Sequence, residues 1–139
     1  GFVVTWGDDD MGGDSRKVRE SLVQITGIQA SDHSFAAITR DGAVVAWGAS
    51  EAGGDCSAVQ DQLWGVQQIQ ATSAAFAAIR SDGAVITWGA DYAGGDSSEV
   101  KHELKQVREV QASANSFAAV RADGSVITWG SARTGCDGK

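Results

Sequence analysis

Basic residues are scarce in this chain. Its 139 residues include 11 lysines and arginines against 18 aspartates and glutamates, which gives a formal net charge of −7. Phosphate backbones and anionic lipid headgroups attract proteins through a basic face. The composition therefore argues against nucleic acid as a partner.

Long apolar runs are also absent. No stretch approaches the roughly 20 apolar residues that a membrane-spanning helix needs, so no direct membrane span is expected. Hydrophobic residues still make up 42% of the chain, which suits a folded core and argues against disorder. We expect a soluble protein that resides inside the cell or inside an organelle.

Only two cysteines are present, Cys56 and Cys136. They fall in different columns of the repeat described below. Serine stands at the sister positions of Cys56, and glycine stands at those of Cys136. A disulfide between them is therefore not expected as part of the architecture, and two lone thiols do not define a redox compartment.

Tryptophan recurs at one spacing. Four tryptophans stand 41 residues apart, each followed by glycine: Trp6, Trp47, Trp88 and Trp129. A fixed period of this size indicates like supersecondary units that bury their apolar faces against one another. The complete units run over about residues 7–47, 48–88 and 89–129, with a partial unit at each end. We expect residues 1–139 to form a single repeat domain with all four tryptophans in its core.

Each unit opens with a glycine pair and an aspartate. The shared positions are Gly12, Gly53 and Gly94, with Asp14, Asp55 and Asp96 two residues later. Such a turn predicts a short helix with the aspartate as its N-cap. In the third unit Glu99 is expected to complete a capping box with Asp96.

Three strands are predicted after the helix of each unit. In the second unit they cover residues 66–71, 75–79 and 83–88, and Asp82-Gly83 between the last two is a strong hairpin signal. Both faces of the last strand carry apolar residues, so both are expected to be covered by neighbouring units.

The residues at 82–89, DGAVITWG, follow a Val-x-x-Ile strand and an Ala-Ala-Ile strand and precede a Gly-Gly-Asp turn. This pattern resembles the repeat of the RCC1-like β-propellers, and the resemblance covers the whole chain. It implies blades of mostly antiparallel strands set radially around a channel, commonly seven per ring. It also implies functions dominated by protein binding, which include nucleotide exchange on a small GTPase, chromatin association and service beside ubiquitin-ligase domains.

The chain departs from that family pattern in several places. Where the family usually has Gly-x-x-His after the first strand, the three units have the residues 31–34, 72–75 and 113–116, which keep neither the glycine nor the histidine. The usual proline is missing, since the chain has none. The resemblance therefore implies a fold more firmly than an activity.

The strand count predicts an incomplete ring. The chain begins with a third strand at residues 2–6 and then has three full units, which cannot close a seven-blade ring. It also starts at Gly1 rather than at methionine. We expect a fragment of a longer propeller, one of several copies that complete a ring, or an open arc that a partner caps. A trefoil-like, three-fold closed β fold is the alternative, although the surplus strand and the helix weigh against it.

Asp8, Asp10 and Asp14 are weak candidates for a metal site. Carboxylates at alternate positions beside a glycine turn offer the oxygen ligands that a hard cation prefers. The sister segments at 49–52 and 90–93 do not keep these carboxylates. A solvated surface turn is therefore the favoured interpretation, and no metal or cofactor is expected.

No catalytic set is visible. His33 and His102 occupy unrelated columns, and no nucleophile or carboxylate is placed by sequence to work with either of them. Metal-ligand spacings and phosphate-binding loops are also missing from the sequence. We therefore expect a protein that is not an enzyme.

Two further features raise the question of ligands and partners. Gln29, Gln70 and Gln111 recur in the strand nearest the expected channel, where a buried ladder of hydrogen-bonded amides is favoured over a ligand role. Trp64 has no repeated counterpart, because Val23 and Lys105 hold its sister positions. An exposed indole here would suit an interface anchor, and local packing over the helix end is the alternative.

The positions shared by all units are apolar, glycine or capping residues, so the repeats share packing rather than chemistry. We therefore expect a non-enzymatic protein–protein interaction or scaffold module, an accessory structural subunit of a larger complex. Self-association to complete the ring is also open. The alternative is a regulatory RCC1-like domain of a longer multidomain protein, of the ubiquitin-ligase or small-GTPase exchange-factor type.

Overall fold

The computed structural model describes residues 2–131. Within these residues the chain forms nine β-strands and six short 3₁₀-helices. In chain order the elements are η1 Asp9–Met11, η2 Arg16–Ser21, β1 Ile25–Ala30, β2 Ser34–Thr39, β3 Val44–Gly48, η3 Ser50–Ala52, η4 Ser57–Gln62, β4 Val66–Ala71, β5 Ala75–Arg80, β6 Val85–Gly89, η5 Asp91–Ala93, η6 Lys101–Glu103, β7 Val107–Ala112, β8 Ser116–Arg121 and β9 Val126–Gly130.

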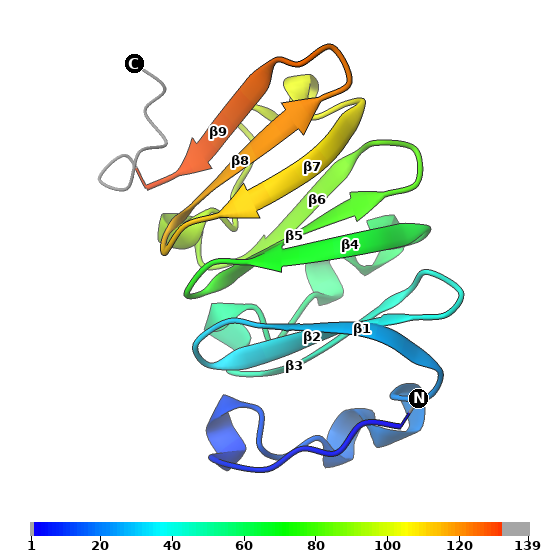
Figure 1. The fold of residues 1–139 in the computed structure, drawn as a ribbon. Helices are drawn as coiled ribbons and strands as arrows, with labels where there is room; N and C mark the ends of the chain where they lie inside the picture. Colours follow the sequence, from blue (N-terminus) through cyan, green and yellow to red (C-terminus); the bar gives the residue numbers. More distant parts are fainter. Residues whose placement is uncertain (1, 132–139) are drawn as a thin grey trace.

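The strands form three separate antiparallel sheets. Sheet 1 is β1-β2-β3, sheet 2 is β4-β5-β6 and sheet 3 is β7-β8-β9, each in chain order. The sheets are stacked one after another along the chain (Figure 1). No strand pairs with a strand of another sheet within residues 2–131, so the trefoil-like closed alternative is wrong.

Three connectors carry the helices: connector 1 is residues 8–24, connector 2 is residues 49–65 and connector 3 is residues 90–106. The one helix predicted after the glycine turn of each unit corresponds to η2, η4 and η6, whereas η1, η3 and η5 precede that turn and were not predicted. The expected N-caps are wrong. The side chain of Asp55 accepts a hydrogen bond from the backbone N–H of Ser57, one residue before the position that a helix cap would hold. Runs of only three to six residues form 3₁₀ turns readily, because they are too short to stabilise α-helix.

The capping box predicted in connector 3 is also wrong. There η6 begins at Lys101, with Val100 in the N-cap position. The side chain of Asp96 accepts from the backbone N–H of Ser98 instead. A turn over residues 98–100 separates this aspartate from the helix, so Glu99 does not lie in the first turn of η6.

A tryptophan on the third strand of each sheet stacks on a phenylalanine of the middle strand. The ring centroids are 5.4 Å apart in all three pairs, which are Phe35–Trp47, Phe76–Trp88 and Phe117–Trp129. The two residues of each pair lie directly opposite one another in the strand register. The stack therefore fixes the pairing of these two strands.

The indole of each stacked tryptophan also holds the connector that precedes its sheet. Trp88 Nε1 donates to the carbonyl oxygen of Gly53 at 3.0 Å, and the other two sheets repeat this bond at 3.1 Å. Gly53 has φ +100°, and a Cβ there would lie 2.5 Å from the ring of Phe76. Only glycine allows the connector to approach the aromatic stack this closely.

Connectors 2 and 3 are bonded to the preceding sheet as well. The carbonyl oxygen of Ala52 accepts from Ser34 Oγ of sheet 1 at 2.6 Å, while the next carbonyl, that of Gly53, accepts from Trp88 of sheet 2. In connector 3 the carbonyl of Ala93 accepts from Thr72 Oγ1 of sheet 2 at 2.8 Å. Two adjacent carbonyl groups of one connector therefore join consecutive sheets.

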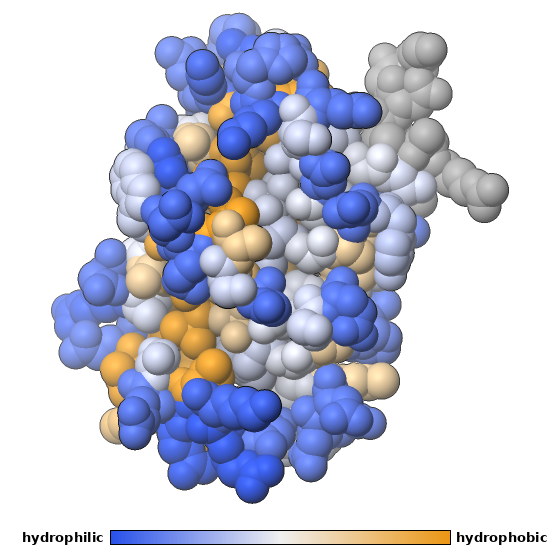
Figure 2. Space-filling view, turned by 180° about the vertical axis from the view of Figure 1, so that it is seen from behind, coloured by the Kyte–Doolittle hydropathy of each residue, from blue (hydrophilic) through white to orange (hydrophobic). Residues whose placement is uncertain are grey.

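The core runs through the stack from sheet to sheet. The first strands of neighbouring sheets contact one another, and Ile69, Phe76, Val110 and Phe117 are buried between sheets and connectors. Figure 2 shows an apolar band along the length of the molecule between hydrophilic groups. The expectation that neighbouring units cover the sheets on both faces is met in full by sheet 2.

The prediction that residues 2–6 form a strand with a buried Trp6 is wrong. These residues are assigned to no strand, and Trp6 is 83% exposed, whereas the other three repeat tryptophans are 5% exposed. Within residues 2–131 no middle strand pairs with this segment, so Trp6 has no phenylalanine on which to stack.

Replacing Trp88 with alanine should lower the free energy of unfolding by about 3–5 kcal/mol, because it removes a buried indole and leaves the carbonyl of Gly53 without its donor. Chemical denaturation followed by circular dichroism measures this loss. Trp6→Ala is the matched control and should change the stability little. Equal losses from the two substitutions would contradict the structure.

A candidate protein-binding surface

Trp64 lies near the end of connector 2, two residues after the last residue of η4, Gln62. Its indole is 50% exposed. The guanidinium carbon of Arg80, on β5, lies 3.8 Å from the centroid of the indole ring. One face of the ring is therefore covered by a cation, which is a favourable cation–π arrangement. The indole therefore packs locally on Arg80 and is half exposed, while its role as an anchor for a partner stays a prediction.

Arg80 is held firmly in place. Its Nη1 donates to the carbonyl oxygen of Gln62 at 3.2 Å. Its Nε and Nη2 donate to the two carboxylate oxygens of Asp82 at 3.1 and 2.6 Å. A bidentate arginine–carboxylate pair restricts the guanidinium plane. The guanidinium group that packs against the indole of Trp64 is therefore held in one orientation without any partner.

The charge of this group is stable at neutral pH. The side-chain hydrogen bonds from Arg80 hold the pKa of Asp82 below its ordinary value, with a further contribution from the backbone N–H of Ala84. A lowered carboxyl pKa means that the pair is complete at neutral pH and is lost only when the pH falls through that lowered pKa. We name Gln62, Trp64, Arg80 and Asp82 the Trp64 surface.

The sequence indicated Trp64 but not its support. The column of Arg80 holds Thr39 in the first unit and Arg121 in the third, while the column of Trp64 holds Val23 and Lys105. Only the second unit therefore combines an aromatic residue with a cation at these two positions. The sequence alone does not show that these two positions lie next to each other in space. The structure shows that they do.

The three candidate metal ligands do not form a site. Asp8 accepts from the backbone N–H of Asp10 at 2.9 Å, and both carboxylate oxygens of Asp14 accept from the guanidinium of Arg16 at 2.7–2.8 Å. These bonds from Arg16 hold the pKa of Asp14 well below its ordinary value. No group of three or more metal-ligating side chains occurs in the part of the chain that the structure describes.

The ladder of buried amides predicted for the repeated glutamines is wrong. Gln29 and Gln111 are exposed, and Gln70 is half-buried. The side chain of Gln111 donates to Glu109 on its own strand at 3.3 Å, not to a neighbouring glutamine. Gln29 and Gln70 lie opposite Ala36 and Ala77 in the strand register, so they share the face that packs toward the next sheet, yet neither side chain is fully buried there.

His33, His102 and Cys56 do not converge on a site in the described residues. His33 lies in the turn between β1 and β2, His102 lies in η6, and both are exposed. Cys56 is buried, and its Sγ donates to the side-chain oxygen of Gln60 at 3.2 Å. Cys136 lies outside the described residues. Burial raises the pKa of the Cys56 thiol, which opposes thiolate chemistry there.

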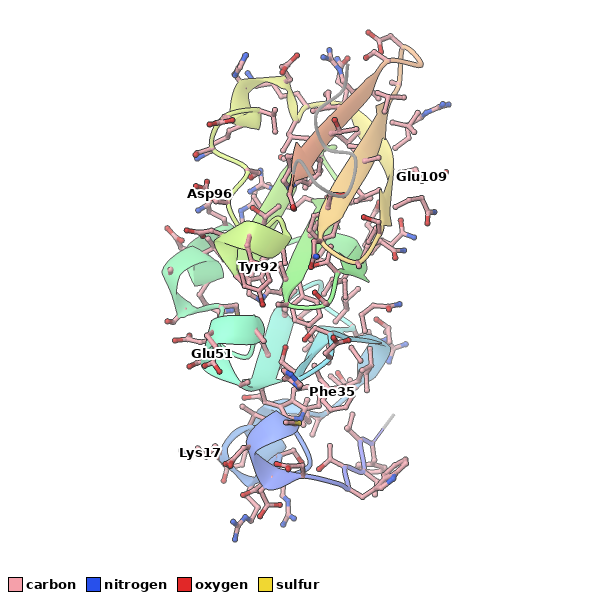
Figure 3. All side chains as sticks on the ribbon, turned by 90° about the vertical axis from the view of Figure 1, so that its left-hand side faces the viewer. Lys17, Phe35, Glu51, Tyr92, Asp96 and Glu109 are labelled. Carbon is pink, nitrogen blue, oxygen red and sulfur yellow. The ribbon has the colours of Figure 1, made fainter. Side chains whose placement is uncertain are left out.

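The connectors give one edge of the molecule its acidic character. Figure 3 shows Glu51, Tyr92 and Asp96 along this edge, while Glu109 of β7 lies on the opposite side. Glu51, Tyr92 and Asp96 are exposed. Glu51 and Tyr92 occupy one column that varies between the units, whereas Asp96 belongs to the shared aspartate column and is exposed as well.

Comparison with known proteins concerns the fold. No protein-family model and no curated protein matches the chain by sequence. The structure of Kap60 bound to yeast RCC1 (Prp20) matches with a TM-score of 0.63 and 17% identity, over 90% of this chain and 38% of the matched chain.

Two further solved structures have the same arrangement. Prp20p from Saccharomyces cerevisiae, described with its binding to Gsp1p and histones, matches with a TM-score of 0.56 and 15% identity, over 76% of this chain and 30% of its own. Human WBSCR16 matches with a TM-score of 0.54 and 19% identity, over 76% and 34%. The chain therefore spans about a third of the length of these structures.

The described residues have the fold of an RCC1-like β-propeller, as a partial arc of three blades that does not close. The fold predicted from the sequence is thereby confirmed, and sheets 1–3 are blades 1–3. Within residues 2–131 no helix has both the length and the apolar character needed to cross a membrane.

Replacing Trp64 with alanine should lower the free energy of unfolding by only about 1 kcal/mol, because the indole is half exposed and loses one surface cation–π contact. Chemical denaturation measures the loss beside that of Trp88→Ala. A loss as large as that of Trp88→Ala would contradict the assignment of Trp64 to the surface.

The Cys56 thiol should react slowly in the folded chain, because it is buried and its pKa is raised. The measurement uses the Cys136→Ser variant, so that a thiol-specific reagent reports Cys56 alone. At pH 8 we expect slow labelling in buffer and rapid labelling in denaturant. Equal rates in the two conditions would contradict the burial of this side chain.

Proposed function

We propose that the chain is a non-enzymatic protein-interaction module, a scaffold of RCC1-like blades that binds a protein partner through the Trp64 surface. The observation that carries this proposal is the half-exposed indole of Trp64 on an arginine whose three donor groups are already bonded. Residues 1–139 act as one repeat domain in this proposal, an accessory structural subunit of a larger complex.

The side chains of the Trp64 surface are of the kind that dominates binding energy at interfaces. Tryptophan, tyrosine and arginine are enriched among residues whose loss costs the most binding energy. The indole is rigid, and Arg80 has already lost its rotamer freedom to Asp82 and Gln62. When a partner covers the free face of the indole, the side chains of the Trp64 surface therefore lose little conformational entropy.

The charge of the chain favours a basic partner. The net charge is −7, and exposed carboxylates such as Glu51 and Asp96 line the connector edge. Charge complementarity of this kind raises the rate of association and selects against acidic partners. The structural neighbour Prp20p is described with its binding to histones, which is in keeping with a basic protein as the class of partner.

The test immobilises the chain, exposes it to an extract of its source, and measures the affinity of the partner that it binds. Trp64→Ala should weaken the binding of a specific partner by about 30-fold, which corresponds to roughly 2 kcal/mol. Lys105→Ala is the matched control, because Lys105 holds the same turn position in the third unit. Its binding should stay at the wild-type level. Undiminished partner binding by the Trp64→Ala chain would contradict the proposal.

A second candidate is a regulatory role on a small GTPase. It is favoured by the fold match to Prp20p, which is described with its binding to Gsp1p. The test measures release of labelled nucleotide from small GTPases in the presence of the chain. Faster release would favour this candidate over the scaffold, whereas an unchanged rate across the GTPases of the source would remove it.

A further inference from the structure

The place that Arg80 fills in blade 2 is hollow in blade 1. The groove along β6 has a volume of about 180 Å³, and Arg80 is not among the residues that line it. The sister groove along β3 has a volume of about 500 Å³ and extends over Thr39 and Asp41. Thr39 is the sister residue of Arg80. Its short side chain therefore leaves open the space that a guanidinium group takes up in blade 2.

A second hollow adjoins this groove. It has a volume of about 330 Å³ and shares Ser21, Thr39 and Asp41 with the groove along β3. Its other walls are Val23, Gln24 and Arg40. We name Ser21, Val23, Thr39 and Asp41 the blade 1 pocket.

The blade 1 pocket has the surroundings of an arginine without the arginine. Arg80 is bonded to the carbonyl of Gln62 and the carboxylate of Asp82, and the indole of Trp64 lies on its guanidinium group. The sister residues of these three in blade 1 are Ser21, Asp41 and Val23. A carbonyl, a carboxylate and an apolar side chain are thus present at the same three positions of the repeat.

The backbone holds these positions in the same arrangement in both blades. The N–H of Arg40 donates to the carbonyl of Gln24 at 2.9 Å, and the sister bond from Ser81 to Gly65 is 2.7 Å. The turns that carry the two aspartates, between β2 and β3 and between β5 and β6, project on the same side of the stack (Figure 1). Blade 2 is therefore a template for what the blade 1 pocket can hold.

We propose that the blade 1 pocket binds an arginine side chain of a protein partner. The guanidinium group donates to the carboxylate of Asp41 and to the carbonyl of Ser21, and its flat face lies against Val23. These contacts repeat those that Arg80 makes in blade 2. The site is separate from the Trp64 surface, so the inference adds a second binding site to the proposed interaction module.

The carboxylate of Asp41 is available to such a partner. The two ion pairs among the described residues involve Asp14 and Asp82, so neither Asp41 nor the neighbouring Arg40 is paired there. The hydroxyl of Thr39 donates to Asp41 Oδ1 and holds the pKa of this carboxyl below its ordinary value. Asp41 is therefore charged at neutral pH. Each carboxylate oxygen can accept more than one hydrogen bond, so acceptor sites remain for a guanidinium group.

The chemistry of the pocket favours arginine over lysine. A guanidinium group is planar, donates two parallel hydrogen bonds to one carboxylate and packs flat against an apolar side chain. An ammonium group is compact and strongly hydrated, and it cannot form this parallel pair. The net charge of −7 also favours a cationic group over an anionic one.

The access to the pocket does not depend on what flanks the described residues. The contacts of Arg80 all lie within residues 62–82, in connector 2 and sheet 2. Blade 2 has a blade on either side, yet Trp64 is 50% exposed and the side chain of Asp82 is 43% exposed. A blade placed before blade 1 in the same way would therefore leave the blade 1 pocket open.

The test titrates the isotope-labelled chain with N-acetyl-arginine amide and follows the backbone amide signals by NMR. The signals of Val23 and Asp41 should shift until they saturate, with a dissociation constant on the order of 1 mM for so small a probe. N-acetyl-lysine amide should bind at least about 5-fold more weakly. Shifts that do not saturate, shifts confined to Trp64, or equal affinity for the two probes would overturn the proposal.

Two substitutions probe the pocket itself. Asp41→Asn removes the charge and should weaken binding of the arginine probe at least about 10-fold. Thr39→Arg supplies from the chain itself the side chain that blade 2 has, so it should fill the pocket and abolish binding of the probe. Circular dichroism verifies that each variant is folded, and Asp41→Asn carries the test alone if Thr39→Arg does not fold. Binding at the wild-type level by either folded variant would overturn the proposal.

Asp123→Asn is the matched control, because Asp123 is the sister of Asp41 in blade 3 and the substitution removes the same charge. It should bind the arginine probe like the wild type, and a loss as large as that of Asp41→Asn would show a general charge effect and overturn the proposed site. Trp64→Ala should also bind the probe like the wild type. The partner binding assigned to Trp64 and the arginine binding assigned to Asp41 can therefore fail separately.

Discussion

The hydrogen bond from a buried indole to a glycine carbonyl holds this fold together. It joins the third strand of a blade to the connector before that blade, across 35 residues of chain. In connectors 2 and 3 the adjacent carbonyl is bonded to the preceding blade, so each of these two connectors ties two blades together. A buried indole N–H without a partner costs free energy, and so does an unpaired carbonyl. The repeat therefore keeps its tryptophan and the glycine that lets the connector come close.

The sequence predicted the architecture because the period of the repeat is also the period of the packing. Strands 66–71 and 75–79 agree with β4 and β5 almost to the residue, and the fold class was predicted from the same pattern. Trp6 was assigned to the core because it shares a column with three buried tryptophans. Its exposure could not be predicted that way, because burial depends on a neighbouring strand and not on the residue itself.

The surface was harder to predict for a related reason. Comparing equivalent positions of the repeat shows which residues the units share, whereas a binding surface depends on the positions at which the units differ. Trp64 was noticed because it breaks its column, but its stacking on Arg80 joins two columns whose contact only the fold reveals. The glutamines were misjudged in the opposite way. Their repetition suggested a buried role, yet Gln29 and Gln111 are exposed, and Gln29 is exposed although it lies on the face toward sheet 2.

Hydrogen exchange of the tryptophan indole N–H groups, followed by NMR, tests the central claim most directly. The chain has five tryptophans. The account predicts three slowly exchanging indole protons, from Trp47, Trp88 and Trp129, because each is buried and bonded to a glycine carbonyl. In the single chain, Trp6 and Trp64 should exchange rapidly. Uniform exchange across the four repeat tryptophans would contradict the claim that this bond, rather than the sequence period alone, holds the blades together.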